Sequence, residues 1–143
     1  MNHFEKFNNW VLDVYKSKGG SLKIDSKKPF TMEVVTNQGV PTGVNVDNLG
    51  SYPYLPITVF HSALFLLQTK GGSALKGDAM SHKLGEGDLP LDSIEGYIAY
   101  LVFGQEIGSS VFRKITPISR ILEASGVCYK KAGKDDGYLH LAQ

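Results

Sequence analysis

Hydrophobic residues near the N-terminus recur with the period of an α-helix. Phe4, Phe7, Val11 and Val14 stand three or four positions apart, which places their side chains on one face of a helix. The pattern predicts an amphipathic helix from about residue 3 to about residue 17. A pair of glycines at positions 19 and 20 then ends it, because glycine readily adopts the left-handed conformation found after helices.

The segment that follows alternates apolar and polar residues. The apolar positions of this alternation are Leu22, Ile24, Phe30, Met32, Val34, Val44 and Val46. A period of two is typical of half-buried β-strands, so the sequence predicts two or three short strands of an antiparallel sheet. Pro53 and Pro56 then interrupt any regular element. We expect a junction there between portions 1–54 and 55–143, which are either distinct or parts of one continuous compact domain.

Helical spacing returns after these prolines. Pro56 suits the first turn of a helix, and apolar residues at 57, 60, 64 and 67 give that helix a buried face. A shorter helix is predicted from Ser73 to about Leu84, with Ser73 as its N-cap, and another from Asp92 to about Phe103. Asp92 and Glu95 have the spacing of a capping box, in which each side chain accepts from the backbone N–H of the other residue.

The C-terminal segment has the most distinctive pattern. Thr116 suits an N-cap and Pro117 the first helical position, and apolar residues at 118, 121 and 122 form a core stripe. Gly126 stands where a left-handed C-cap is expected, and two short strands around a polar turn at 132–137 follow. A helix followed by a hairpin is the order of a recognition helix and its wing. The sequence therefore predicts an α+β fold in which an N-terminal helix and a small antiparallel sheet precede a helical, winged-helix-like C-terminal portion with a β-hairpin wing.

Charge adds to this picture because it is unevenly distributed. The chain has 15 Lys and Arg against 14 Asp and Glu, so it is not a polybasic protein of the histone kind. Between residues 113 and 134 the basic residues are Arg113, Lys114, Arg120, Lys130, Lys131 and Lys134, and the only Asp or Glu before Lys134 is Glu123. Residues 78–106 have the opposite balance, with six acids and one lysine. One face of the folded chain is therefore expected to be positive.

The basic residues predict a non-enzymatic nucleic-acid-binding or regulatory module with DNA as its partner. We expect Ser119 and Arg120 to face outward from their helix and to touch the DNA groove, since Ser and Arg side chains contact phosphates and base edges. The residues expected to hold the phosphate backbone are Arg113, Lys114, Lys130, Lys131 and Lys134. The alternative is a merely solvated face, balanced by the acidic segment.

Two other functions fit the same pattern. Winged-helix domains also serve as protein-interaction or adaptor modules, and a homodimer formed through the N-terminal half is a further expectation. The third alternative is a small metal-dependent nuclease that uses Asp25, Lys27 and Glu33 on the predicted strands. Tyr52 and Tyr54 stand beside prolines, and they are expected either to anchor an interface or to pack the two portions together.

The remaining reactive residues give no catalytic signature. Cys128 is the only cysteine, which excludes an internal disulfide and a thiolate-rich zinc site, and its apolar surroundings predict a buried thiol. Asp78 and His82 would share a helix face, but two ligands are too few for a metal site. We therefore expect no cofactor, no metal and no catalytic residue. No segment has the pattern of a signal peptide or a membrane span, so we expect a cytoplasmic location and no membrane partner.

Overall fold

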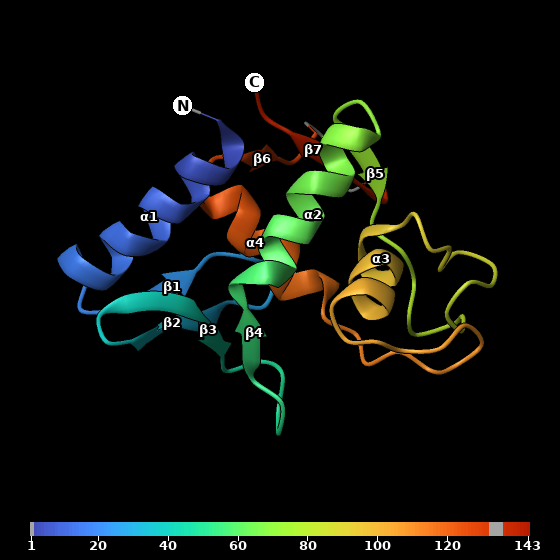
Figure 1. Ribbon diagram of the computed structural model, residues 1–143, viewed down its shortest axis with the longest axis horizontal. Coiled ribbons are helices and arrows are strands. Elements are labelled where there is room, and N and C mark those ends of the chain that lie inside the picture. Colours follow the sequence, from blue (N-terminus) through green and yellow to red (C-terminus); the bar gives the residue numbers. More distant parts are fainter. Residues whose placement is uncertain (1, 132–135) are drawn as a thin grey trace.

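Four helices and seven strands make up the part of the chain that the computed structural model describes, residues 2–131 and 136–143 (Figure 1). The elements are α1 (His3–Ser17), β1 (Ser21–Ile24), β2 (Phe30–Asn37), β3 (Val40–Val46), β4 (Tyr54–Pro56), α2 (Ile57–Thr69), β5 (Ser73–Leu75), α3 (Ile94–Leu101), α4 (Ile115–Ala124), β6 (Cys128–Tyr129) and β7 (Tyr138–Leu141). All strand pairs are antiparallel. The predicted α+β class is thus confirmed.

The first sheet has the strand order β1-β2-β3-β4. Strands β2 and β3 form a hairpin whose two turn residues, Gln38 and Gly39, both have positive φ angles of 53° and 80°, as the tight turns that suit the twist of a hairpin require. Helix α1 packs on this sheet through Phe7, Val11 and Val14, which are all buried. The predicted N-terminal helix and sheet are therefore confirmed, and β4 adds a short strand within the proline-containing segment.

The second sheet has the order β5-β7-β6, so its central strand is the last one in the chain. Ser73 pairs with His140 and Leu75 with Tyr138, which makes Ser73–Leu75 a strand rather than the start of a helix. The helix predicted from Ser73 to Leu84 is wrong, because pairing with β7 supplies backbone hydrogen bonds that local sequence cannot reveal. Residues 76–93 contain no helix and run over the surface beside α3 (Figure 1).

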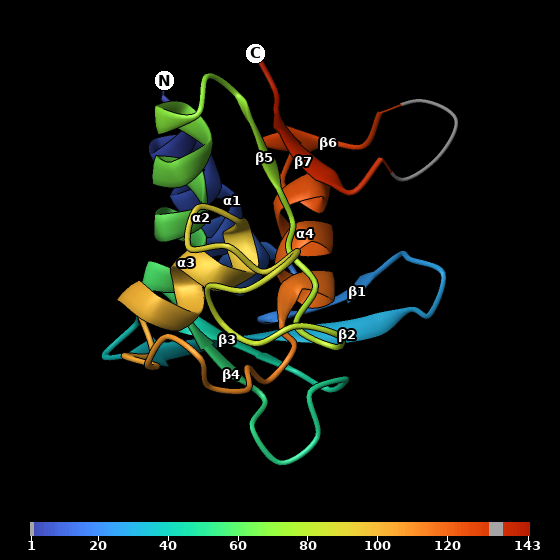
Figure 2. The same ribbon diagram turned by 90° about the vertical axis from the view of Figure 1, so that its right-hand side faces the viewer.

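Helix α4 lies between the two sheets (Figure 2). It contacts β1 on one side and β6 on the other, and α2 packs against it as well. Its buried residues are Ile115, Pro117, Ile118, Ser119, Ile121 and Leu122. One cluster of buried side chains runs from Phe7 on α1 to Leu139 on β7 and includes this helix. The helix is consequently part of the core that joins the N-terminal and C-terminal portions.

The helix starts differ from the predicted ones. Ser93 caps α3, since its Oγ accepts from the backbone N–H of Gly96 at 3.1 Å. Asp92 instead pairs with Lys70 at 2.7 Å, so the capping box expected for Asp92 and Glu95 is not formed. Helix α4 begins at Ile115, one residue before the expected cap. Within the described residues, no helix is both long enough and apolar enough to cross a membrane.

Candidate functional site

The segment just before α4 is held in place by a buried carboxylate. Glu95 on α3 is 1% exposed, and its Oε1 accepts from the backbone N–H groups of Lys114 at 2.7 Å and Ile115 at 3.1 Å. These are donors of the kind that the first turn of a helix leaves without a partner. Desolvation raises the pKa of Glu95, and the two N–H donors act against that shift. Glu95 therefore anchors the start of α4 and the two cations, Arg113 and Lys114, that precede it.

A positively charged cavity of about 550 Å³ opens beside the first half of α4. Its lining residues are Ser26, Lys27, Lys28, Pro29, Asn48, Leu49, Arg113, Thr116, Pro117 and Arg120. Four of these are basic and none is acidic. They come from the β1–β2 connection, the segment before α4, and α4 itself. We call the cavity the basic groove and define it by Lys27, Lys28, Arg113 and Arg120.

The four cations of the basic groove differ in how far they are neutralised. Arg120 donates from Nη1 to Glu123 at 2.8 Å, and both side chains are less than one-fifth exposed. The exposed Arg113 donates to the Sδ of Met80 at 2.9 Å. In the described part of the chain, no carboxylate lies within ion-pair distance of Arg113 or of the exposed Lys27 and Lys28. Three of the four groove cations thus have no carboxylate partner among the residues that the structure describes.

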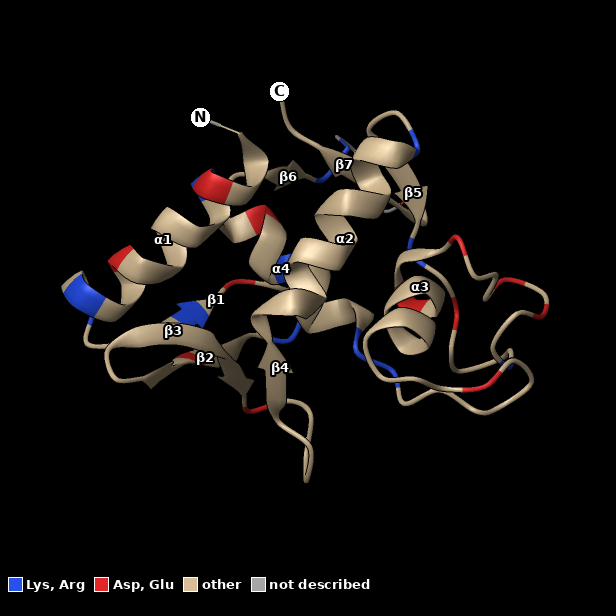
Figure 3. Cartoon of the chain, viewed as in Figure 1, with Lys and Arg blue, Asp and Glu red and all other residues tan. Residues whose placement is uncertain are grey.

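A second cavity, of about 540 Å³, continues from the groove on the side of β5. It shares Arg113, Thr116 and Arg120 with the basic groove and is also lined by Asp78 and Asp88. Figure 3 shows that the acidic residues of this region lie mainly on the loops around α3. The acidic segment therefore reaches the neighbouring cavity, but it contributes no side chain to the lining of the basic groove.

Ser119 does not occupy the outward position expected for it. Its side chain is 2% exposed, and its hydroxyl donates to the carbonyl oxygen of Thr116 at 3.2 Å. The prediction failed because it assumed that one face of α4 is free, whereas sheets pack on two sides of the helix. Arg120 is only partly exposed for the same reason.

The lysines of the predicted wing lie apart from the groove lining. Lys130 and Lys131 follow β6 and are exposed, and neither lines the basic groove. Lys134 falls outside the described residues. Figure 2 shows the end of β6 and the β1–β2 connection on the same side of the molecule, with α4 between them. The structure therefore brings Arg113 and Arg120 together with Lys27 and Lys28, whereas Lys130 and Lys131 do not line the groove.

Lys27 and Lys28 were not among the predicted nucleic-acid contacts. They lie in the sequence Ser26-Lys27-Lys28-Pro29 between two predicted strands, which is a connection exposed to solvent. Adjacent lysines in a strand connection were a signal for a phosphate contact, but nothing in the sequence indicated that this connection meets α4.

Lys114 points into a different cavity, of about 580 Å³. The lining residues are Ser51, Tyr52, Pro53, Tyr54, Phe103, Gln105, Phe112 and Lys114. We call this cavity the aromatic pocket and define it by its four aromatic rings and Lys114. The Nζ of Lys114 lies 4.5 Å from the ring centroid of Phe103 and 5.0 Å from that of Phe112, an arrangement in which the ring faces attract the cation. Desolvation lowers the pKa of Lys114. Lys114 is thus half-buried among rings rather than fully exposed.

The aromatic pocket lies where the two portions of the chain meet. Tyr52 and Phe112 touch edge to face, with ring centroids 6.0 Å apart. Tyr52 therefore contacts the C-terminal portion, in agreement with the expectation that it packs the two portions together. Tyr54 donates its hydroxyl proton to the carbonyl oxygen of Thr42 at 3.0 Å. Tyr52 nevertheless remains 72% exposed, which leaves most of its ring available for a ligand.

The residues considered for metal chemistry do not converge. In the regions that the structure describes, no group of three or more His, Cys, Asp or Glu side chains is placed to hold a metal ion. Asp78 and His82 do not share a helix face, because their segment is not helical; Asp78 Oδ1 accepts from the backbone N–H of Met80 at 3.0 Å. Cys128 is buried as predicted, and desolvation raises the pKa of its thiol to about 12.

Comparison of the chain with known protein families, curated proteins and solved structures found no significant match. The basic groove and the aromatic pocket are therefore the features from which we infer a function.

Proposed function

We propose that this protein is a non-enzymatic nucleic-acid-binding module, and that its basic groove holds a DNA phosphate backbone. The observation that carries the proposal is the convergence of Lys27, Lys28, Arg113 and Arg120 on one cavity without an acidic lining residue. Backbone phosphates repeat at close intervals and release counterions when Lys and Arg neutralise them, so a groove with several cations suits them.

The order of the C-terminal elements supports a winged-helix interpretation. Helices α3 and α4 are followed by the β6–β7 hairpin, and β7 also pairs with β5, so a small sheet accompanies the last helix. Here, however, α4 is packed on two sides. A major groove about 12 Å wide accepts a helix only if one face of that helix is free. We therefore propose that Arg113, just before α4, and Arg120, in the middle of α4, contact phosphates, and that binding does not depend on reading base edges along the helix.

The experiment is a titration of fluorescein-labelled DNA, as a duplex and as a single strand of equal length, followed by fluorescence anisotropy at two salt concentrations. If the three groove cations that have no carboxylate partner among the described residues each neutralise one phosphate, affinity for the duplex should fall about 40-fold between about 50 and 200 mM salt. Affinity for the single strand, which releases fewer counterions per phosphate, should fall about 20-fold. The double variant Lys27→Ala/Lys28→Ala should weaken binding and lower the salt slope by about two.

The matched control is Lys16→Ala/Lys18→Ala. These two lysines are also exposed, lie at the C-terminal end of α1 and do not line the groove. The control loses the same charge, but it loses it outside the groove. It should therefore leave the salt slope unchanged. Equal losses in the two double variants, or no binding to either DNA at low salt, would overturn the proposal.

A further inference from the structure

We propose that the aromatic pocket stacks an unpaired nucleobase, so that the preferred ligand is single-stranded nucleic acid rather than duplex. The inference rests on the proposed function. It deepens that function because the basic groove alone would accept the backbone of either form.

The aromatic pocket offers ring surface to a flat ligand. Tyr52 is 72% exposed, Phe112 46% and Phe103 37%, although aromatic side chains of this size are usually well covered. Pro53 follows Tyr52 directly and limits the backbone freedom of that residue. Partly exposed rings in a fixed arrangement are suited to stacking against nucleobases, which all present a π-face.

The charge of the pocket selects the kind of flat ligand. Lys114 is the only charged side chain in its lining. Its ammonium group donates to the carbonyl oxygen of Phe112 at 3.2 Å, and no carboxylate of the described residues lies within ion-pair distance of it. A half-buried cation with donors to spare disfavours a cationic ligand, and a purely apolar ligand would desolvate it further. A nucleotide supplies a ring together with acceptor atoms and a phosphate.

Residues that are neighbours in the sequence line the pocket and the basic groove. Arg113 lines the groove and the next residue, Lys114, lines the pocket. In the β3–β4 connection, Leu49 likewise lines the groove while Ser51 and Tyr52 line the pocket. A strand whose phosphates lie in the groove therefore has the pocket beside it. Bases in a duplex are stacked on their neighbours, so only an unpaired base presents its face to the rings.

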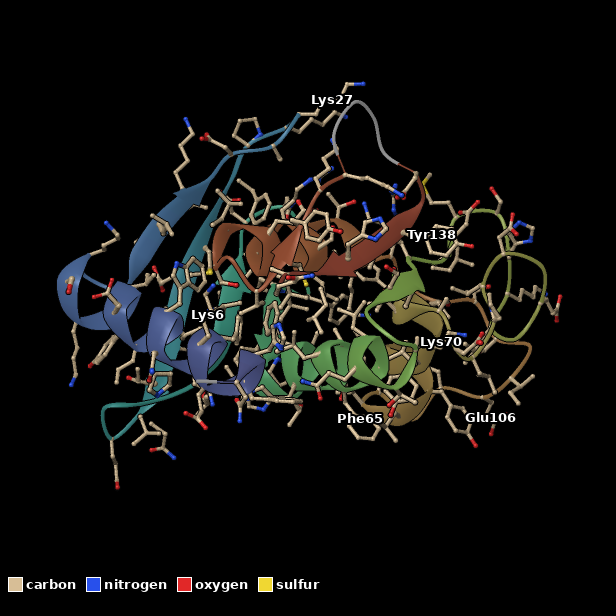
Figure 4. All side chains as sticks on the ribbon, turned by 90° about the horizontal axis from the view of Figure 1, so that it is seen from above. Lys6, Lys27, Phe65, Lys70, Glu106 and Tyr138 are labelled. Atoms are coloured by element: carbon tan, nitrogen blue, oxygen red, sulfur yellow. The ribbon has the colours of Figure 1, made fainter. Side chains whose placement is uncertain are left out.

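The test measures single-stranded and duplex affinities for Tyr52→Ala, with two matched controls. Tyr52→Phe keeps the ring, and Phe65→Ala removes an aromatic side chain that is 55% exposed on α2. Figure 4 shows Phe65 on the opposite side of the molecule from Lys27 of the basic groove. Tyr52→Ala should weaken binding of a short oligodeoxythymidylate about ten-fold, because losing one base–aromatic stack typically costs about 5- to 150-fold in affinity. Tyr52→Phe, Phe65→Ala and the duplex affinity of Tyr52→Ala should stay unchanged.

Competition with thymidine monophosphate distinguishes a free nucleotide from a nucleic-acid strand as the ligand of the pocket. Full displacement of the labelled strand by similar concentrations of mononucleotide and oligonucleotide would identify a free nucleotide as the ligand of the pocket. A much stronger effect of the oligonucleotide would identify a strand, as we expect.

Separate outcomes refute the inference and the proposed function. If the oligonucleotide binds Tyr52→Ala as well as the unaltered protein, or if duplex binds more tightly than single strand, the inference is overturned. In both cases salt-dependent binding through the groove would still support the proposed function. If neither form binds at low salt, the proposed function itself has failed.

Discussion

Replacing Glu95 with alanine should destabilise this protein more than removing most single side chains would. The carboxylate is 1% exposed and accepts both backbone N–H groups at the start of α4. Alanine leaves these two donors without their acceptor, and each buried donor without a partner costs about 1–3 kcal/mol. Removal of a buried carboxylate also relieves a desolvation cost, which offsets part of that loss. We expect the free energy of unfolding to fall by about 2–4 kcal/mol.

Glu95→Gln is the matched control for this experiment. Glutamine keeps one carbonyl oxygen that can accept both N–H groups, so its free energy of unfolding should stay within about 1 kcal/mol of the unaltered protein. The pH dependence provides a second readout. Burial raises the pKa of Glu95, so the folded state binds the proton more tightly than the unfolded chain does. The stability of the unaltered protein relative to Glu95→Gln should therefore be highest at pH values below the pKa that Glu95 has in the unfolded chain. It should decline as the pH rises through the raised pKa that Glu95 has in the folded state.

Urea unfolding followed by circular dichroism across this pH range measures both effects. A urea midpoint for Glu95→Ala equal to that of Glu95→Gln would refute the anchoring role of the carboxylate. A stability difference between Glu95→Gln and the unaltered protein that does not change with pH would refute the assigned direction of the pKa shift. Because the anchored segment carries Arg113 and Lys114, Glu95→Ala should also weaken DNA binding under conditions in which it remains folded.

Three further predictions concern two buried groups, Gly96 and Cys128, and the partly buried His61. Gly96→Ala should lower the free energy of unfolding by about 1–3 kcal/mol, instead of raising it as alanine usually does in a helix, because the new methyl group would press on the carbonyl oxygen of Pro90; unchanged or increased stability would contradict this. The thiol of Cys128, which has a pKa raised to about 12 by burial, should not react with a thiol-specific reagent until urea unfolds the chain. Burial lowers the pKa of His61, so an NMR titration should show its imidazole taking up a proton at lower pH in the folded protein than in urea. Equal midpoints in the two states would argue against that shift.

Local pattern identified most of the elements that pack against the core. The helical spacing of Phe7, Val11 and Val14 indicated α1 correctly, because periodicity records which face of an element must avoid water. The same reasoning found β1, β2 and β3 of the first sheet and the order of α4 followed by a hairpin, but it missed β4, which lies in the proline-containing segment. It failed for Ser73–Leu75, which is a strand only because β7 lies beside it. A partner that distant in the sequence leaves no local signal.

The residues of the candidate site also divide into those that the sequence indicated and those that only the structure revealed. The sequence alone marked Arg113, Lys114 and Arg120 as cations gathered near one helix, since charge segregation can be read directly from residue order. Only the tertiary structure decided that Ser119 is buried, that Lys114 turns toward aromatic rings, and that the β1–β2 connection brings two more lysines to the groove. Those outcomes depend on which surfaces pack against α4. The packing is fixed by burial of the whole core rather than by any single segment, and a sequence pattern reports only the neighbours within its own element.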